Sequence, residues 1–408
     1  HNGKISLFWA LATLLPLTAK FGFSTTIQSL AHTYLLEYIP FILLITSLYT
    51  ITGGIRLDLK FQTTPLINTL ILIMGSLCAS LIGTTGAAML FIRPMLALNQ
   101  WRKNKTHLMI FFIFSICNIG GCLTAVGDPP LLLGYLKGID FFWTTQHLFI
   151  PFLIIMIPLM TLFFMMDWYY YHKDLENTDP PIQKSKTLVR GKINFFLLGL
   201  VIGVILLTGT FRSGKGLSIM GLFWPLESII REVCLIVLTL LSLLLSSRET
   251  RLFNVFTWDP ILEVAKLFAA IFVTVIPVLA ILGLGTAGAL SSIVNLVTSN
   301  GEPVNIAYFW LSGLLSSFLD NAPTYLVFFH LAGADPVLLM TTQAKTLAAI
   351  SAGSVFMGAL TYIGNAPNFL VKSMAETKSI RMPSFFGYIG WSLVILGPLF
   401  LLTSFFFY

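Results

Sequence analysis

The sequence contains few charged residues. Asp, Glu, Lys and Arg together make up 10% of its 408 residues, whereas roughly 25% is usual in a soluble domain. Hydrophobic residues reach 56%, and the mean hydropathy is +0.87. This composition excludes a soluble fold and predicts a membrane protein.

Cysteines are scarce and enzyme motifs are missing. The sequence has no phosphate-binding loop, zinc-ligand spacing or nucleophile elbow. We therefore expect no enzyme activity, no cofactor and no ATP-driven transport. The Cys residues lie in apolar stretches, and we expect them to be small core residues without a disulfide or redox role. They are Cys78, Cys117, Cys122 and Cys234.

Acidic residues are fewer than basic ones, which gives a net charge of +7. Most of the 24 Lys and Arg residues lie in short loops between apolar runs. Basic residues in such loops set membrane orientation, so the charge does not predict nucleic-acid binding. If the polar linker 171–192 is cytoplasmic, most Lys and Arg residues, including Lys60, lie on the cytoplasmic side of the membrane. Few, such as Arg212, lie on the outer side.

Long apolar runs recur along the chain. A membrane-spanning helix needs about 20 mostly apolar residues, so we predict an all-α polytopic protein. The chain begins at His1 without a Met, and residues 4–19 lack a cleavage-site pattern, so we expect a span there rather than a removable leader. Full or broken spans are predicted at 4–19, 33–53, 106–137, 147–170, 193–211, 226–246, 268–292, 338–368 and 384–407.

Two further apolar stretches, 65–100 and 303–333, are interrupted in the middle. The interruptions are Gly83-Thr84-Thr85-Gly86 and Asp320-Asn321-Ala322-Pro323. Two full crossings need about 40 residues and a turn, which neither stretch provides. Each stretch therefore predicts a re-entrant hairpin with its polar tip in the middle of the membrane.

An internal repeat relates the two hairpins. The shift that carries Gly127 onto Gly364 also carries Thr124 onto Thr361, and residues 33–170 thereby match 270–407. The alternation of spans opens the first hairpin to the cytoplasm and the second to the outside, so we expect inverted repeats. The predicted organisation is an N-terminal span at 1–32, repeat 1 at 33–170, the cytoplasmic linker at 171–192, connecting spans at 193–269 and repeat 2 at 270–408.

Each repeat also contains a second interruption, after its hairpin. Asn118, Thr124, Gly127 and Asp128 mark the first, and 358–368 is the second. Gly and Pro free backbone groups there, and unwound backbone in a membrane persists where it lines a polar cavity. Freed carbonyls coordinate cations, and half-helix N-termini attract anions. Ordinary kinks whose Thr and Asn side chains bond neighbouring helices are the alternative, but four interruptions at matching positions favour binding.

Two carboxylates lie within predicted membrane segments. A charge at the bilayer centre costs roughly 3 kcal/mol or more, so Asp128 and Asp320 are functional candidates. Asp128 can bind a cation directly. Asp320 can bind a cation or a proton, or it can simply cap the half-helix that follows.

These segments resemble the ion transporter superfamily, in particular a branch labelled sodium:proton antiporter and citrate transport protein. The resemblance covers residues 30–407 and rests on Asn118-Ile-Gly-Gly, Gly127-Asp128-Pro129-Pro130, Ser317-Phe-Leu-Asp320-Asn321-Ala-Pro323-Thr324 and Thr361-Tyr-Ile-Gly364-Asn365-Ala-Pro367-Asn368. It implies a homodimer in which a transport half moves as an elevator against a scaffold half.

The resemblance also implies two binding sites. The first would use Thr84, Thr85, Asn118 and Asp128, and the second Asp320, Asn321, Thr324, Thr361 and Asn365. Thr124, Gly127 and Gly364 complete the ion- or substrate-binding set, with Asp128, Asn118, Asp320 and Asn321 as sodium ligands. The antiporters typically carry acidic residues in the first hairpin, where this chain has Thr84-Thr85. The anion symporters typically show Ser-Asn-Thr at both tips, which this chain lacks.

The prediction for function is secondary transport. Sodium/proton antiport comes first, because intramembrane carboxylates mark ion pathways. Sodium-coupled symport of citrate or another di- or tricarboxylate is the alternative, followed by permeation of other anions and by a scaffold without transport. We expect Na+ and H+ or a small carboxylate as transported partners, and a multi-pass location in the bacterial inner membrane.

Overall fold

The computed structural model describes residues 2–59, 62–176, 188–211, 213–219, 221–254, 256–282, 288 and 291–408. Lys60, Arg212, residues 177–187 of the predicted linker and part of the predicted span 268–292 lie outside this description. In the described part, eight helices are long and apolar enough to cross a membrane. The prediction of an all-α polytopic membrane protein agrees with this architecture.

Helices make up most of the described structure, and the strands described form short two-stranded antiparallel ribbons. The main helices outside the hairpins and the interrupted helices are α1 (Asn2–Phe21), α2 (Phe23–Thr33), α3 (Ile39–Thr52), α8 (Trp143–Leu175), α9 (Lys192–Thr210), α10 (Leu226–Leu245), α12 (Asp259–Leu282) and α19 (Phe385–Phe407). The two hairpins are α4 (Pro65–Ile82) with α5 (Thr84–Leu98), and α14 (Asn305–Phe318) with α15 (Asn321–Leu331). The interrupted helices are α6 (Thr106–Ser115), η2 (Ile119–Leu123) and α7 (Pro129–Leu136), and α17 (Ala344–Phe356), η4 (Met357–Leu360) and α18 (Ala366–Thr377). Short elements are η1 (Tyr34–Tyr38), α11 (Arg248–Phe253), α13 (Ser291–Val297), α16 (Pro336–Met340), β1 (Arg56–Asp58), β2 (Leu188–Arg190), β3 (Gly216–Ile219), β4 (Leu222–Pro225), β5 (Thr298–Ser299) and β6 (Glu302–Pro303).

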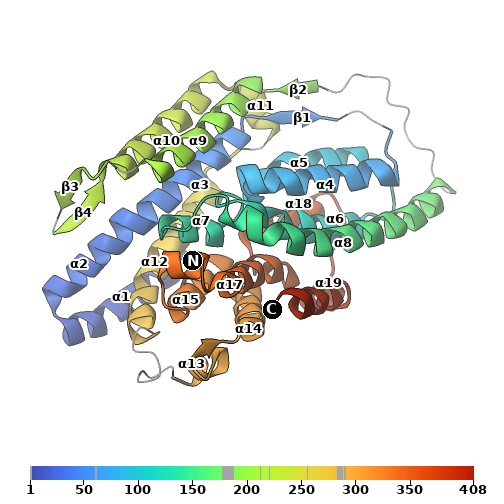
Figure 1. The fold of residues 1–408 in the computed structure, drawn as a ribbon. Helices are drawn as coiled ribbons and strands as arrows, with labels where there is room; N and C mark the ends of the chain where they lie inside the picture. Colours follow the sequence, from blue (N-terminus) through green and yellow to red (C-terminus); the bar gives the residue numbers. More distant parts are fainter. Residues whose placement is uncertain are drawn as a thin grey trace.

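Two groups of helices pack side by side (Figure 1). The first helix group contains α1, α2, η1, α3, α9, α10, α11 and α12. The second helix group contains both hairpins, both interrupted helices, α8 and α19. Contacts of α3 with α5 and of α12 with α15 join the groups, so each hairpin's return helix faces the first helix group.

The hairpins break where the sequence predicts. Helix α4 ends at Ile82, and α5 begins at Thr84. Gly83 lies between them with a φ of +81°, in the region that favours glycine. Helix α14 ends before an extended Asp320, from which α15 begins. In each hairpin the two helices pack against one another. A polar tip within an apolar hairpin is therefore observed in both halves.

Several predicted boundaries were wrong by up to a few turns. Helix α12 begins at Asp259 rather than at residue 268, and Pro260 favours a helix start there. The charged residues Glu263 and Lys266 interrupt the apolar run in the first turns, so the sequence pattern predicted a later start. The second interrupted helix runs from 344 to Thr377 rather than from 338 to 368, since α18 is polar along one side. The span predicted at 33–53 continues a helix from Phe23 through the π-helical segment η1.

The local structure of the interruptions is the same in both halves. The shift that relates Gly127 to Gly364 carries the end of η2 at Leu123 onto the end of η4 at Leu360. It also carries the start of α7 at Pro129 onto the start of α18 at Ala366. Matched helix ends support the predicted repeat, while its inverted orientation in a membrane stays a prediction.

Candidate functional site

Each interruption is tied to the hairpin of its own half by a threonine. Thr124 donates from Oγ1 to the carbonyl of Ser80, near the end of α4. Thr361 donates from Oγ1 to the carbonyl of Ser317 over 2.5 Å, near the end of α14. These bonds satisfy carbonyls at the hairpin tips, where the helical hydrogen-bond ladder stops. Both threonines thus hold the interrupted helix beside the tip.

Glycines let the backbone fold back tightly at each interruption. A Cβ on Gly127 would lie 2.1 Å from the carbonyl oxygen of Gly121, and one on Gly364 would lie 2.6 Å from that of Gly358. No side chain fits at either distance. The carbonyl of Gly127 accepts from the backbone N–H of Thr84 over 2.9 Å, which joins this interruption to the first hairpin tip.

The side chains of four predicted site residues meet at Asp128. Its Oδ1 accepts from Oγ1 of Thr84 over 2.8 Å and from Nδ2 of Asn365 over 3.1 Å. Its Oδ2 accepts from Nδ2 of Asn321. We call Thr84, Asp128, Asn321 and Asn365 the polar centre. It draws on both hairpins and both interruptions, whereas the resemblance implies two separate sites.

Asp128 is a buried carboxylate with neutral partners. Only 1% of its surface is exposed. The salt bridges among the described residues do not include it. An ionised carboxylate in such surroundings costs several kcal/mol unless a positive charge compensates it. The polar centre therefore suits the binding of a small cation or a proton.

Helix N-termini add positive potential at the polar centre. Asp128 and Asn365 are the N-cap residues of α7 and α18, and Thr84 and Asn321 are the first residues of α5 and α15. Each N-terminus contributes about half a unit of positive charge. This potential offsets part of the Asp128 charge, and it favours anions when a cation neutralises that carboxylate.

Two amide oxygens near the interruptions have no hydrogen-bond donor among the described residues. They are Oδ1 of Asn118 and Oδ1 of Asn321, and both side chains are fully buried. Asn118 uses its Nδ2 to bond the carbonyl of Ile113 and Oδ1 of Asn368, each over 2.8 Å. Unpaired buried oxygens are costly and are suitable ligands for a hard cation such as sodium.

The remaining predicted site residues lie outside the polar centre. Thr85 lines a cavity of about 40 Å³ beside Thr84 and Asp128, large enough for a water molecule. Asp320 accepts from the backbone N–H of Ala322 over 3.2 Å and so caps α15. Thr324 donates to the carbonyl of Asp320 over 3.1 Å. The contact observed for Asp320 is therefore the helix cap, the alternative to an ion-binding role.

Asn368 lies in the last motif but is not among the predicted site residues. Its Nδ2 donates to the carbonyls of Gly358 and Thr361, each over 2.9 Å, while its Oδ1 accepts from Asn118. Asn368 thus joins the two interruptions. The sequence feature that could have identified Asn368 is its position, three residues after Asn365 in an interrupted apolar segment.

A buried ion cluster that joins α8 to the start of α6 and the loop before it was not predicted. Asp167 lies inside the predicted span 147–170 and is fully buried. It accepts from Nη1 of Arg102 and lies 2.8 Å from Nε2 of His107. Arg102 lies in a short loop between helices, and its side chain is buried, with Nε 3.3 Å from Asp174. The compensated charges mark this cluster as structural.

Comparison with known proteins places the chain in a family. A search of curated proteins gave no match. The profile of one family, described as "Putative citrate transport", matches residues 1–408. This agrees with a multi-pass membrane transporter and with the expectation that the chain is not an enzyme. Because the match extends over the whole chain, the protein belongs to this transport family.

Proposed function

We propose that the protein exchanges sodium ions for protons across the membrane, with Asp128 holding either cation. The observation that carries this proposal is the environment of Asp128. Its carboxylate is buried and accepts from Thr84, Asn321 and Asn365, which are all neutral. One cation would compensate its charge, and a second would then be repelled. Sodium and proton would therefore compete for it.

The oxygen atoms around Asp128 support sodium as the competing ion. The hydroxyl of Thr84 lies 2.8 Å from the carboxylate, and Oδ1 of Asn321 is unpaired. Hydroxyl, amide and carboxylate oxygens are hard ligands of the kind that alkali and alkaline-earth cations prefer. When sodium replaces a proton, the side-chain amides of Asn321 and Asn365 would rotate, so that their oxygens, rather than their NH2 groups, face the bound ion.

Sodium-coupled uptake of citrate or another di- or tricarboxylate is the second candidate. The family description names citrate transport. The helix N-termini around the polar centre would attract a carboxylate once sodium neutralises Asp128. In this candidate, sodium binds first and the anion follows.

Reconstituted vesicles separate the two candidates. The protein is placed in proteoliposomes with an imposed pH gradient, reported by a pH-sensitive dye, and sodium is added outside. Antiport predicts that sodium collapses the gradient and that Asp128→Asn, reconstituted to the same level, does not respond. Accumulation of labelled citrate that depends on sodium, without proton movement, would instead establish the second candidate.

The assembly and motion belong to the same proposal. We expect a homodimer in the bacterial inner membrane, in which the second helix group slides against the first. Among the described residues, individual polar ties between the groups would have to break for this motion, including the bond from Oη of Tyr135 to the carbonyl of Ile205 at 2.7 Å. Others are the ion pair between Lys137 and Glu37, at 2.5 Å, and the bond from Nη1 of Arg93 to the carbonyl of Phe253, at 2.5 Å.

A further inference from the structure

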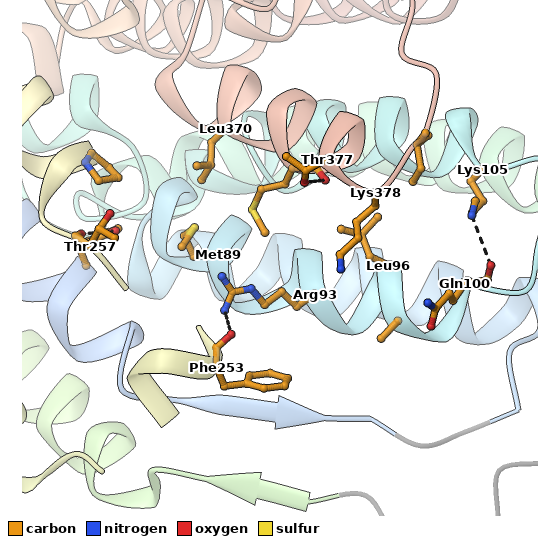
Figure 2. A pocket seen from close by; sticks show the side chains of 15 residues that line it. Met89, Arg93, Leu96, Gln100, Lys105, Phe253, Thr257, Leu370, Thr377 and Lys378 are labelled. Carbon is orange, nitrogen blue, oxygen red and sulfur yellow. Dashed lines mark hydrogen bonds between the residues drawn. The ribbon is translucent and has the colours of Figure 1, made fainter. Parts of the chain in front are cut away.

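A large cavity lies between the two helix groups, away from the polar centre. It has a volume of about 620 Å³ and is bounded by α5, α18 and the segment that joins α11 to α12 (Figure 2). None of the four residues of the polar centre lines it. Tyr49 lines both this cavity and the small one beside Asp128.

The charges around this cavity have one sign. Arg93, Lys105 and Lys378 line it, and no Asp or Glu does so among the residues described. Figure 2 shows Lys378 pointing from α18 towards α5, while Arg93 reaches from α5 towards Phe253. Much of the remaining wall is apolar, including Met89. Charges of one sign between walls of low dielectric create a strong local potential that attracts anions.

The basic groups in the cavity retain hydrogen-bonding capacity. Both bonds of Arg93 to the first helix group use Nη1: one to the carbonyl of Phe253 and one to Oδ1 of Asn254 at 3.3 Å. The guanidinium has donors on Nε and Nη2 as well. The bond of Lys105 to the carbonyl of Gln100 is long, at 3.5 Å. Neutral oxygens are thus the hydrogen-bond partners of Arg93 and Lys105, and Asp174, which does not line the cavity, is the carboxylate whose charge acts on Lys105.

We propose that this cavity is a binding site for a small anion with two or three carboxylate groups, separate from the polar centre. The volume is within the range of small-molecule sites, roughly 300–1,000 Å³. Three cations on different elements match an anion whose charges are spread over several groups better than a monovalent ion. Arg93 binds a carboxylate with parallel N–H donors, and Lys378 and Lys105 bind the others.

Isothermal titration with citrate tests the site on the purified full-length protein. Wild-type protein is expected to bind citrate, and Arg93→Gln and Lys378→Gln are each expected to weaken binding roughly tenfold, as for the loss of one charge-assisted hydrogen bond. Lys372→Gln is the matched control. Lys372 is also on α18 and pairs with Glu376 at 2.8 Å, but it does not line the cavity. Its substitution removes the same charge and should leave citrate affinity unchanged.

Several outcomes would overturn the proposal. Wild-type protein that does not bind citrate would do so, as would an equal loss of affinity in Lys372→Gln. Displacement of citrate by anionic phospholipid in nanodiscs, with lipid binding that is stronger and equally dependent on Arg93, would identify a lipid site instead. Size-exclusion profiles check the fold, and Lys378→Gln keeps the test valid if Arg93→Gln aggregates.

The same titration with Asp128→Asn separates this site from the proposed exchange centre. Citrate binding that persists in Asp128→Asn and is still weakened there by Arg93→Gln, while sodium-driven proton flux is lost, supports two distinct sites. Loss of citrate binding in folded Asp128→Asn would place the anion at the polar centre and contradict the proposal. Citrate binding in a protein that shows no antiport would leave the anion site standing and refute the exchange mechanism.

Discussion

Asp128 and Asn365 occupy equivalent positions in the two halves of the chain, and their side chains bond to one another. Nδ2 of Asn365 donates to Oδ1 of Asp128 over 3.1 Å, and each residue is the N-cap of the half-helix that follows its interruption. Thr84 and Asn321 are likewise equivalent, and both donate to the Asp128 carboxylate. Two similar halves thus build one centre that has a single carboxylate.

Thr84→Val tests the hydroxyl in this centre. Valine has nearly the same shape but cannot donate to Asp128 or coordinate sodium. The apparent sodium affinity of transport should fall roughly tenfold, the typical effect of losing one buried polar partner. Sodium-dependent flux in proteoliposomes measures the change. Thr208→Val is the control, because the Thr208 hydroxyl bonds only within α9, and it should leave the sodium dependence as in the wild type.

Gly127→Ala tests the tight backbone at the first interruption. The added Cβ would lie 2.1 Å from a backbone carbonyl oxygen, so the interruption must move. We expect the protein to lose roughly 3 kcal/mol or more of stability and to lose transport. Thermal unfolding followed by intrinsic fluorescence measures the stability. Gly199→Ala in α9 meets no atom within 4 Å and should leave the stability unchanged. An equal loss of stability in both variants would show that the close contact at Gly127 is not the cause.

Asp320 variants distinguish a helix cap from an ion ligand. The observed contact is the cap on Ala322, and asparagine caps as well as aspartate does. Asp320→Asn should therefore retain transport, whereas Asp320→Ala should lower stability by about 1 kcal/mol. Flux assays and thermal unfolding of both variants give the comparison. Complete loss of sodium-dependent flux in a stable Asp320→Asn protein would show that its charge takes part in transport.

A cross-link between the helix groups tests their relative motion. Glu37 lies in η1 of the first group, and Lys137 directly follows α7 of the second, with their charged atoms 2.5 Å apart. Cysteines at both positions, joined by a bifunctional thiol reagent, should stop transport, and a cleavable reagent should allow its recovery on reduction. The single-cysteine variants treated in the same way are the controls. Transport at the wild-type rate in fully cross-linked protein would exclude a sliding mechanism.

Most interruptions were predictable from the sequence, because Gly, Pro and polar residues are unusual inside apolar runs. Gly83 and Asp320 mark the hairpin tips, and Thr124 and Thr361 the interruptions, at positions where the structure breaks its helices. Helix ends such as Asp259 were less predictable, since charged residues in the first turns of a membrane helix conceal its start.

Contacts between the halves were not predictable in the same way. The bonds from Asn321 and Asn365 to Asp128 join segments far apart in the chain, and no local pattern specifies their approach. The same holds for Asp167, which looks like an isolated charge in a span until Arg102 and His107 are found beside it. Interactions across a fold depend on packing, which periodicity and composition do not describe.

Proton release on sodium binding is the most direct test of the account, because it asks whether one carboxylate holds either cation. Purified wild-type protein in weakly buffered solution is titrated with sodium while a pH indicator reports released protons, with choline as the control cation. We predict that sodium binding releases protons from the wild type, and that folded Asp128→Asn releases none. Sodium binding without proton release in the wild type, or an unchanged release in Asp128→Asn, would contradict the account.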